Sequence, residues 1–363
     1  MAVGLNVYRL VLRLESPVAL PTRRARLGYL GAPNYIPATT LRGALITALY
    51  REGMVDENAL KSEASYPTMI VSPAYPLADG KESKPAHPFI YQCKQCEDSK
   101  PFTTESKVFR GILSSEEIEL PSECHHGHRA LRMLHPSPVI DNGGGVLEEV
   151  GVKVFRYVAV NISRRRAAAV KGVLYSYELI AGPNEFWATI ASRRELDLNG
   201  LLLLVGRGVS RGLGRVKVEK AQKIDLFSAA QTFANPTERP FLLRAMSPLL
   251  GCRGAGLEWM NYPETIDLGG LAGAFNINGR GKMTLEKVYG RTVTFDAGWD
   301  MYNTRLRPRF QAKAPGTIVQ ASMKDVSGDV GLLMAVLRYW GDIILYGGST
   351  PITGVNMLEP VEV

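Results

Sequence analysis

The stretch LLLLVGRGVSRGLGRV, residues 201–216, joins two strand-like segments through a loop that holds four glycines and three arginines. The apolar run before the loop and the alternating residues after it are typical of β-strands. Glycine lets a backbone take positive φ and approach a ligand closely, and arginine presents forked donors to phosphate. The loop therefore predicts contact with a polyanion; the alternative is a hairpin turn whose arginines are merely solvated. The candidate ligand contacts are Gly206, Arg207, Gly208, Ser210, Arg211, Gly212, Gly214 and Arg215.

The two familiar glycine-rich nucleotide loops do not fit this stretch. A P-loop ends in Gly-Lys-Ser/Thr and opens a helix, and residues 206–216 do neither. A dinucleotide fingerprint needs a third glycine where Arg211 stands, and a helix after it. The position between two strands therefore excludes these nucleotide-cofactor loops.

The composition is typical of a soluble globular protein with an acidic partner. The 363 residues suffice for two domains, with 45% hydrophobic and 21% charged residues. The formal net charge of +8 favours nucleic acid as a partner before a membrane. The first residues alternate like a strand instead of forming a signal peptide, and the apolar stretch from Gly331 to Tyr346 is too short to span a bilayer. We expect a cytoplasmic protein without membrane contact.

The N-terminal part predicts a strand, a basic loop and a helix. Pro37 keeps the residue before it extended, and Thr39 or Thr40 can cap the helix that follows. Gly43 inside that helix indicates a close contact with another backbone. One helical face is apolar and would pack on a sheet; it consists of Leu41, Ala44, Leu45, Ala48 and Leu49.

Strands and helices alternate in a way that predicts an α+β fold of two ferredoxin-like units, the arrangement of RNA-recognition motifs, in tandem. We expect the first unit at residues 1–222, with a proline-rich insertion at about 75–150, and a second, degraded unit at residues 223–363. A helix from about Val330 to Leu345 would end at Gly347-Gly348.

Cysteines and histidines gather in the insertion. Three of the four cysteines and all five histidines lie between residues 87 and 135. A CxxC turn offers two thiolates, and a second Cys/His pair completes a tetrahedral zinc site. The preferred ligands are Cys93, Cys96, Cys124 and His128, with His126 as the substitute for His128.

Such a site would be structural, because four protein ligands leave no open coordination position. We expect the metal to fold an insertion that cannot build its own core. A redox-active CxxC pair and a disulfide remain as alternatives. Cys252 stands apart and is expected to be a buried core thiol.

Four segments resemble CRISPR-associated RAMP proteins. Residues 36–45, IPATTLRGAL, resemble the helix start IPGSSLRGAL of these proteins, and residues 206–216 resemble their glycine-rich loop with the motif SRGLGRV. Residues 161–178 resemble the segment before that loop in type III members. Gly298-Trp299 and residues 312–318, AKAPGTI, are similar to the GW and AVPAGS signature of the subunit that caps the 5′ end of the guide RNA, most like that of type III-D.

The resemblance implies a non-catalytic RNA-binding subunit of a type III effector complex. It would hold the 5′ handle of the CRISPR RNA, seat the large polymerase-like subunit and contact the backbone RAMP subunits. The arginines of the glycine loop would contact phosphates, together with Arg42 and with Arg164, Arg165 and Arg166. Tyr29 and Tyr35 would stack on unpaired bases or, alternatively, lie at the edge of the core.

Two other readings stay open. The first is an RNA endonuclease of the same superfamily, for guide processing or target cleavage, although no histidine precedes residue 87. Asp141, Asp296 and Asp300 would be its candidate aspartates, yet an isolated loop aspartate is usually a turn residue. The second reading is an unrelated, zinc-stabilised RNA-binding protein.

Overall fold

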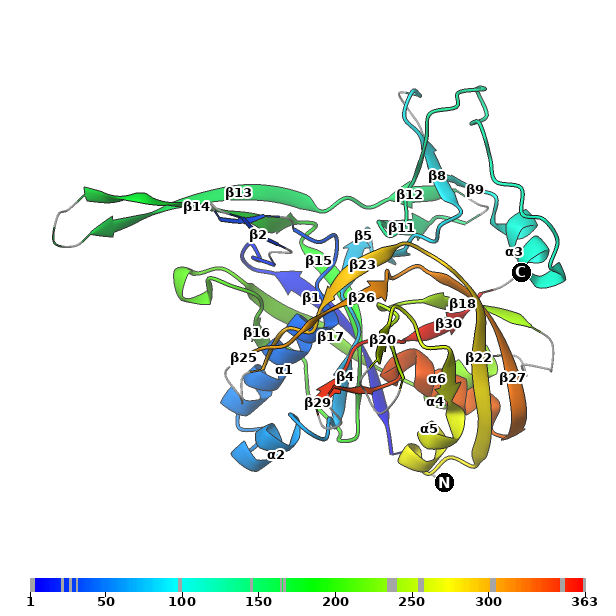
Figure 1. The fold of residues 1–363 in the computed structure, drawn as a ribbon. Helices are drawn as coiled ribbons and strands as arrows, with labels where there is room; N and C mark the ends of the chain where they lie inside the picture. The colour runs from blue at the N-terminus through cyan, green and yellow to red at the C-terminus, as the bar shows by residue number, and fades with distance from the viewer. Residues whose placement is uncertain are drawn as a thin grey trace.

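The computed structural model describes residues 4–20, 23–25, 28–30, 32–96, 100–143, 146–163, 165, 168–233, 240–253, 258–300, 305–346 and 350–361. It shows a mixed α and β fold built around two larger antiparallel sheets (Figure 1). The predicted α and β composition is therefore confirmed. Among the described helices, none is long and apolar enough to cross a membrane.

The first large sheet has the strand order β16-β17-β1-β15-β5-β6, and β4 also pairs with β15. The bounds are β1 Asn6–Leu14, β4 Met69–Val71, β5 Tyr75–Ala78, β6 Lys81–Glu82, β15 Glu185–Ser192, β16 Leu202–Leu204 and β17 Arg215–Ile224. Helix α1 (Ala38–Arg51) and the short helix α2 (Glu57–Ser62) lie between β1 and β4 in the chain.

Helix α1 packs through the face that its sequence predicts. Its buried residues include all five members of the expected apolar face, and they share a core with Leu10 and Leu12 of β1. The expected cap is wrong: Pro37 takes the N-cap position, so Thr39 and Thr40 lie inside the first turn. No described protein atom lies within 4 Å of a Cβ added at Gly43, so the tight helix–sheet contact is wrong, while an approach of an RNA backbone to Gly43 stays a prediction.

The second large sheet has the strand order β21-β22-β27-β18-β30. The bounds are β18 Phe241–Ala245, β21 Thr265–Asp267, β22 Gly279–Tyr289, β27 Ile318–Gly328 and β30 Leu358–Pro360. The helices of this half are α4 (Leu226–Gln231), α5 (Leu268–Phe275) and α6 (Val330–Trp340). Helix α6 ends earlier than predicted, at Gly341 with φ of 72°, and residues 344–346 form a strand.

One large core connects the two halves. It joins Val7 of β1 and Trp187 of β15 to Leu243 of β18 and to the apolar side chains of α6. The first sheet therefore carries α1 on one face and α6 on the other. Burial on both faces accounts for the apolar residues on both sides of β1.

The insertion packs on the second half instead of remaining without a core. Phe89 and Phe109 share a buried cluster with Leu242 of β18 and Ile318 of β27. Its elements are β7 Lys84–Pro85, β8 Ile90–Cys93, β9 Phe102–Thr103, α3 Glu105–Ser114, β10 Leu131–Met133, β11 Pro138–Asp141 and β12 Leu147–Glu149. The expectation that the insertion cannot build a core is thus corrected, and the folding role of a metal stays a prediction.

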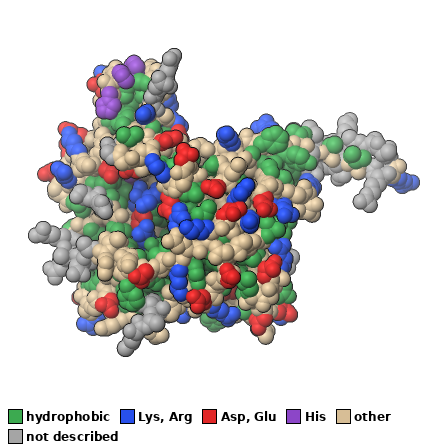
Figure 2. All heavy atoms as spheres, turned by 180° about the vertical axis from the view of Figure 1, so that it is seen from behind, with side chains coloured by type: hydrophobic (Ala, Val, Ile, Leu, Met, Phe, Trp, Pro, Cys, Tyr) green, Lys and Arg blue, Asp and Glu red, His purple; other side chains and the backbone are tan. Residues whose placement is uncertain are grey.

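A long hairpin projects from the body as an arm (Figure 1). It consists of β13 (Lys153–Ser163) and β14 (Ala168–Gly182), and β14 pairs with β3 (Gly28–Leu30), which pairs with β2 (Arg23–Ala25). Apolar side chains such as Phe155 and Val158 are exposed on it, and Figure 2 shows hydrophobic side chains near its base.

Short strand pairs complete the fold. They are β19 Gly251–Arg253 with β20 Glu258–Met260, β23 Thr292–Asp296 with β26 Arg309–Lys313, β24 Trp299–Asp300 with β25 Arg305–Leu306, and β28 Ile344–Tyr346 with β29 Thr350–Ile352. The β23–β26 pair reaches across to the N-terminal end of α1, where Gly298 lies against Thr39.

Candidate nucleic-acid groove and metal centre

The glycine-rich loop is a tight connection between β16 and β17 that contains the 3-10 turn Val209–Arg211. All four of its glycines have positive φ, between 77° and 82°. A Cβ on Gly206 would lie 2.3 Å from the carbonyl oxygen of Ala19, and one on Gly214 would lie 2.1 Å from that of Val205. These two glycines are therefore required for packing of the backbone within the protein.

Most of the loop amides already have acceptors inside the chain. The N–H of Arg207 donates to Ala19, and that of Gly214 donates to Pro17. The amides of Arg211 and Gly212 close the 3-10 turn. The arginine side chains, more than the backbone amides, are therefore the groups with which this loop can meet a polyanion.

The loop places its polar side chains at the surface. Arg207, Ser210 and Arg211 are exposed, and Arg207 lines a groove at the start of helix α1. Arg215 is exposed and donates to Glu15 at 3.4 Å. Surface ion pairs of this kind are weak and can exchange for a phosphate.

That groove has a volume of about 560 Å³ and lies between the two halves. Three of the four family-like segments contribute to it: the start of α1, the glycine loop and the glycine of the Gly298-Trp299 pair. The lining residues are Ala19, Leu20, Pro33, Tyr35, Pro37, Ala38, Thr39, Thr40, Pro73, Gly206, Arg207, Pro248, Val293, Thr294, Phe295, Asp296, Gly298, Arg309 and Gly354. Segments that are far apart in the chain therefore meet at one surface.

The groove has a positive electrostatic character. Arg207 and Arg309 come from opposite halves, and the N-terminus of α1 opens onto it without a side-chain cap or an acidic residue in its first turn. The first amides of a helix lack internal acceptors and favour anions. Tyr35 also lines the groove, and burial raises the pKa of Tyr35 to about 12.

Arg42, a predicted RNA contact, has a structural position instead. Its guanidinium donates to a carboxylate oxygen of Glu63 at 2.6 Å and to the carbonyl oxygen of Met69 at 2.7 Å. Its side chain is 12% exposed, and burial lowers its pKa. The structure therefore gives Arg42 a role within the fold, and its predicted contact with RNA stays a prediction.

The basic run at the tip of the hairpin is only partly described. Arg165 is exposed there, whereas Arg164 and Arg166 lie outside the described residues, as do the side chains of Tyr29, Trp299 and Asp300. None of these residues lines the groove as far as the structure describes them. Their predicted contacts with RNA stay predictions.

Sequence reasoning did not place Arg309 in a groove, and it named Asp296 only as a candidate aspartate of the endonuclease alternative. Both belong to the β23–β26 pair, and Arg309 Nε lies 3.1 Å from Asp296 Oδ2. The basic character of residues 305–313 was the available signal. No pattern along the chain, however, associates this segment with α1 or the glycine loop.

The other part of the second-half signature, residues 312–318, packs inside the protein. Residues 314–318 are buried, and Gly316 has φ of 88°. A Cβ there would lie 2.1 Å from the carbonyl oxygen of Ala86 in the insertion. This segment therefore joins the insertion to the second sheet, and it lies away from the exposed groove.

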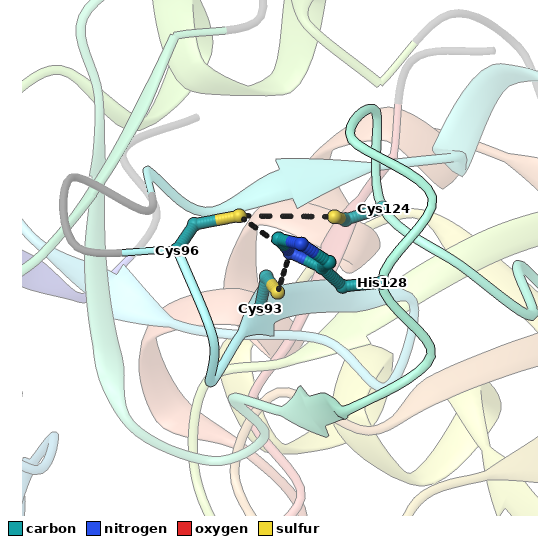
Figure 3. A group of neighbouring side chains, drawn as sticks. All are labelled: Cys93, Cys96, Cys124 and His128. Carbon is teal, nitrogen blue, oxygen red and sulfur yellow. Dashed lines mark hydrogen bonds between the residues drawn. The ribbon is translucent and has the colours of Figure 1, made fainter.

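The predicted metal ligands converge (Figure 3). Their ligand atoms all lie within 4.8 Å of one another: Cys93, Cys96, Cys124 and His128. Cys96 Sγ is 3.8 Å from Cys124 Sγ and 3.3 Å from His128 Nδ1, and Cys93 Sγ is 3.7 Å from the same nitrogen. A tetrahedral zinc requires S···S near 3.8 Å and S···N near 3.5 Å, from bond lengths of about 2.3 and 2.0 Å.

Local turns hold the ligands at this spacing. The N–H groups of Gln95 and His126 each donate to a cysteine sulfur two residues earlier, at 3.4 Å. Gly127 takes a φ of 75° in the second turn. His126 Nδ1 lies 3.5 Å from Cys96 Sγ, but only His128 belongs to the four-ligand cluster.

Two of the clustered thiols have shifted pKa values. Burial opposes ionisation of Cys93, yet hydrogen bonds from Gln95 and Cys96 lower its pKa to about 6. Burial and the neighbouring thiols raise the pKa of Cys96 to about 12. A metal ion deprotonates the thiols that coordinate it, so a bound zinc would hold its cysteine ligands as thiolates.

The alternative roles of these cysteines fit less well. A disulfide needs sulfurs about 2.0 Å apart, and Cys96 and Cys124 are 3.8 Å apart. Cys93 is the last residue of β8, and the described residues 94–96 are not helical, whereas a redox pair of the thioredoxin kind begins a helix. Cys252 is only partly buried, so its predicted place in the core is corrected to the core's edge.

Comparison with known proteins gives distant matches in structure alone. No family model matches the chain, and no curated protein matches it. A chain of a type III-B Cmr-beta complex bound to cognate target RNA and AMPPnP is 12% identical, with 86% of each chain covered and a TM-score of 0.46.

Two further structures are similar over almost the whole chain. A chain of the Csm3-Csm4 subcomplex from the type III-A CRISPR-Cas interference complex is 12% identical, with 99% of this chain and 100% of that chain covered and a TM-score of 0.40. A CRISPR-associated protein Cas6 is 10% identical, with the same coverage and a TM-score of 0.37. The type III-D subtype stays a prediction.

Proposed function

We propose that this chain is a non-catalytic, RNA-binding subunit of a type III CRISPR effector complex. It holds the 5′ handle of the CRISPR RNA in the groove between its two halves. The observation that carries the proposal is the convergence of three family-like segments on that groove. Two arginines and the uncapped N-terminus of α1 face it.

A tandem of two ferredoxin-like units is part of this proposal. In the first half the strands β17-β1-β15-β4 are neighbours, and in the second half the strands β30-β18-β27-β22 are neighbours; all these pairs are antiparallel. When the four strands of each half are numbered 1 to 4 along the chain, both sheets have the order 4-1-3-2. This correspondence supports descent of both halves from one unit, with the boundary expected near residue 222.

The chemistry of the groove supports binding over cleavage. Its described lining residues include no histidine, and burial keeps Tyr35 protonated at neutral pH. RNA cleavage by general acid and base needs a pair of groups that titrate near neutral pH. His87, the first histidine of the chain, is buried against Glu105 in the insertion.

The zinc of this proposal has a structural role. Four protein ligands close the coordination sphere, and the site lies at the projecting end of the insertion, where Figure 2 shows the histidines. A metal there would hold the turn at residues 93–96 to the turn at residues 124–128. The partners of the chain, a large polymerase-like subunit and backbone RAMP subunits, follow from the sequence resemblance.

The test combines identification of the RNA with a charge-matched comparison. RNA that co-purifies with the full chain from its source is sequenced, and its 5′ segment is made as a labelled oligonucleotide. Binding is then measured against salt for the wild type, for Arg207→Ala/Arg309→Ala, and for Arg280→Ala/Arg132→Ala. The control pair removes the same charge from exposed sites on β22 and β10.

Loss of two phosphate contacts lowers the slope of log K against log salt by about 1.4 for single-stranded RNA, and the control pair leaves the slope unchanged. Equal slopes in all three proteins would contradict the proposal. Cleavage of the oligonucleotide by the purified chain would instead support the endonuclease alternative.

A further inference from the structure

Asp296 is the only carboxylate among the described residues that line the groove. An acidic group in a site for a polyanion repels phosphate, and it weakens binding unless it accepts a hydrogen bond from the ligand. Asp296 lies at the end of β23, and its side chain is 47% exposed. Asp296 is therefore the carboxylate acceptor that the described lining offers to a ligand.

The carboxylate is held in one orientation. Oδ1 accepts the N–H of Gly298 at 2.9 Å, and Oδ2 accepts Arg309 Nε at 3.1 Å. A carboxylate has about four acceptor positions on its two oxygens. The two contacts therefore fix the group and leave further acceptor capacity on both oxygens of a residue that lines the groove.

The donors of a nucleic acid are few. Phosphate oxygens at neutral pH carry no donor, so the candidates are the ribose hydroxyl and the N–H groups of the bases. Arg309, which would hold a phosphate, is bonded to Asp296 itself, and this brings the carboxylate within reach of the sugar next to that phosphate. The proline and leucine side chains of the lining offer an apolar surface for a base.

We propose that Asp296 accepts a hydrogen bond from the 2′-hydroxyl of the nucleotide in the groove and makes the groove selective for RNA over DNA. The proposal rests on the function proposed above and specifies its ligand. Arg309 positions Asp296 and contacts the phosphate, which RNA and DNA share. Asp296 contacts the group that only RNA has.

The experiment uses the full chain and three labelled oligonucleotides of one sequence: RNA, DNA and 2′-O-methyl RNA. The variants are Asp296→Asn, which keeps the turn with Gly298, and Asp296→Ala, which removes the acceptor. Asp141→Asn is the matched control, because Asp141 makes the same bond to a glycine N–H two residues on, at 2.8 Å, and does not line the groove.

The wild type and Asp141→Asn should bind RNA about 10- to 100-fold more tightly than either of the other oligonucleotides. The preference should fall to no more than about twofold in Asp296→Ala and to an intermediate value in Asp296→Asn. Arg309→Gln should weaken binding of all three oligonucleotides and, because Arg309 also positions Asp296, should reduce the RNA preference as well.

Three results would overturn the inference. Equal binding of RNA and DNA by the wild type removes the selectivity while leaving the proposed groove in place. An RNA preference that persists in both Asp296 variants would show that a group other than Asp296 distinguishes RNA from DNA. Failure of the wild type to bind any of the oligonucleotides contradicts the proposed function itself.

Discussion

The glycine-rich loop of the first half and the buried segment around Gly316 in the second half share a glycine geometry but differ in their surroundings. Both contain a glycine whose φ is near 80 to 90° and whose Cβ would meet a carbonyl oxygen at 2.1 Å. Around Gly214 the arginine side chains are exposed, whereas around Gly316 the insertion covers the chain. A glycine motif thus reports a close backbone contact, and the neighbouring side chains decide whether a ligand can also reach it.

Removal of the metal from the Cys93, Cys96, Cys124 and His128 site should have the largest effect, and it should leave the glycine-rich loop unchanged. Structural zinc sites contribute roughly 10 kcal/mol or more of binding free energy, which is available for folding. Cys93→Ser/Cys96→Ser or a strong chelator should make residues 93–128 accessible to protease, and the metal content should fall from about one zinc per chain to none. Salt-dependent RNA binding should persist. Full protection in metal-free protein would contradict the structural role.

Gly316→Ala should lower the free energy of unfolding by more than about 4 kcal/mol. The added Cβ would overlap the carbonyl oxygen of Ala86, in addition to the cost of positive φ. Gly212→Ala is the matched control, because φ there is 82° and no described atom lies within 4 Å of the new Cβ. Its expected loss is about 1 kcal/mol. Similar losses in urea titrations of both variants would refute the role of the contact.

Arg42→Ala should lower the free energy of unfolding much more than loss of an exposed arginine from the glycine loop does. Loss of one partner from a buried ion pair costs roughly 3 to 4 kcal/mol, because Glu63 keeps its charge without Arg42. Arg211→Ala, on the exposed loop, should change stability by no more than about 0.5 kcal/mol. The salt slope of RNA binding should stay at the wild-type value in Arg42→Ala. A lower salt slope in Arg42→Ala would instead indicate that Arg42 contacts an RNA phosphate.

Acid should weaken the contact around Gly316 through His135. His135 Nδ1 donates to the carbonyl oxygen of Ala86 at 2.7 Å, and Nε2 accepts the N–H of Arg291 at 3.3 Å. Burial lowers the pKa of His135 to about 4, compared with about 6.5 in an unfolded chain. As pH falls from 6.5 to 4, the unfolded chain therefore binds a proton that the folded chain does not, and stability falls by roughly 3 kcal/mol.

The measurement compares the wild type with His135→Gln in denaturant titrations from pH 7 to pH 4. The difference between the two proteins cancels the acid sensitivity of the metal ligands, which both share. The wild type should lose stability more steeply than the variant. Parallel pH profiles would exclude His135 as the source.

Local patterns predicted the elements well where one residue type dominates a face. The apolar face of α1 and the strand at the N-terminus needed only periodicity, because each packs against the core. The predicted end of α6 at residue 345 was wrong. The residues after Gly341 remain apolar because they continue into β28, so the apolar pattern does not mark the end of the helix. The convergence of the metal ligands was predictable because the four residues lie in two short turns, each of which holds two of them.

The sequence by itself determined the α and β composition, the glycine-rich connection between two strands and the identity of the four clustered Cys and His residues. Each of these depends mainly on residues that are neighbours in the chain. Only the tertiary structure decided that Arg42 is buried while Arg207 and Arg309 face one groove, and that the insertion rests on the second sheet. The physical reason is that burial and long-range pairing depend on which distant segments share a core, and local periodicity does not encode those contacts.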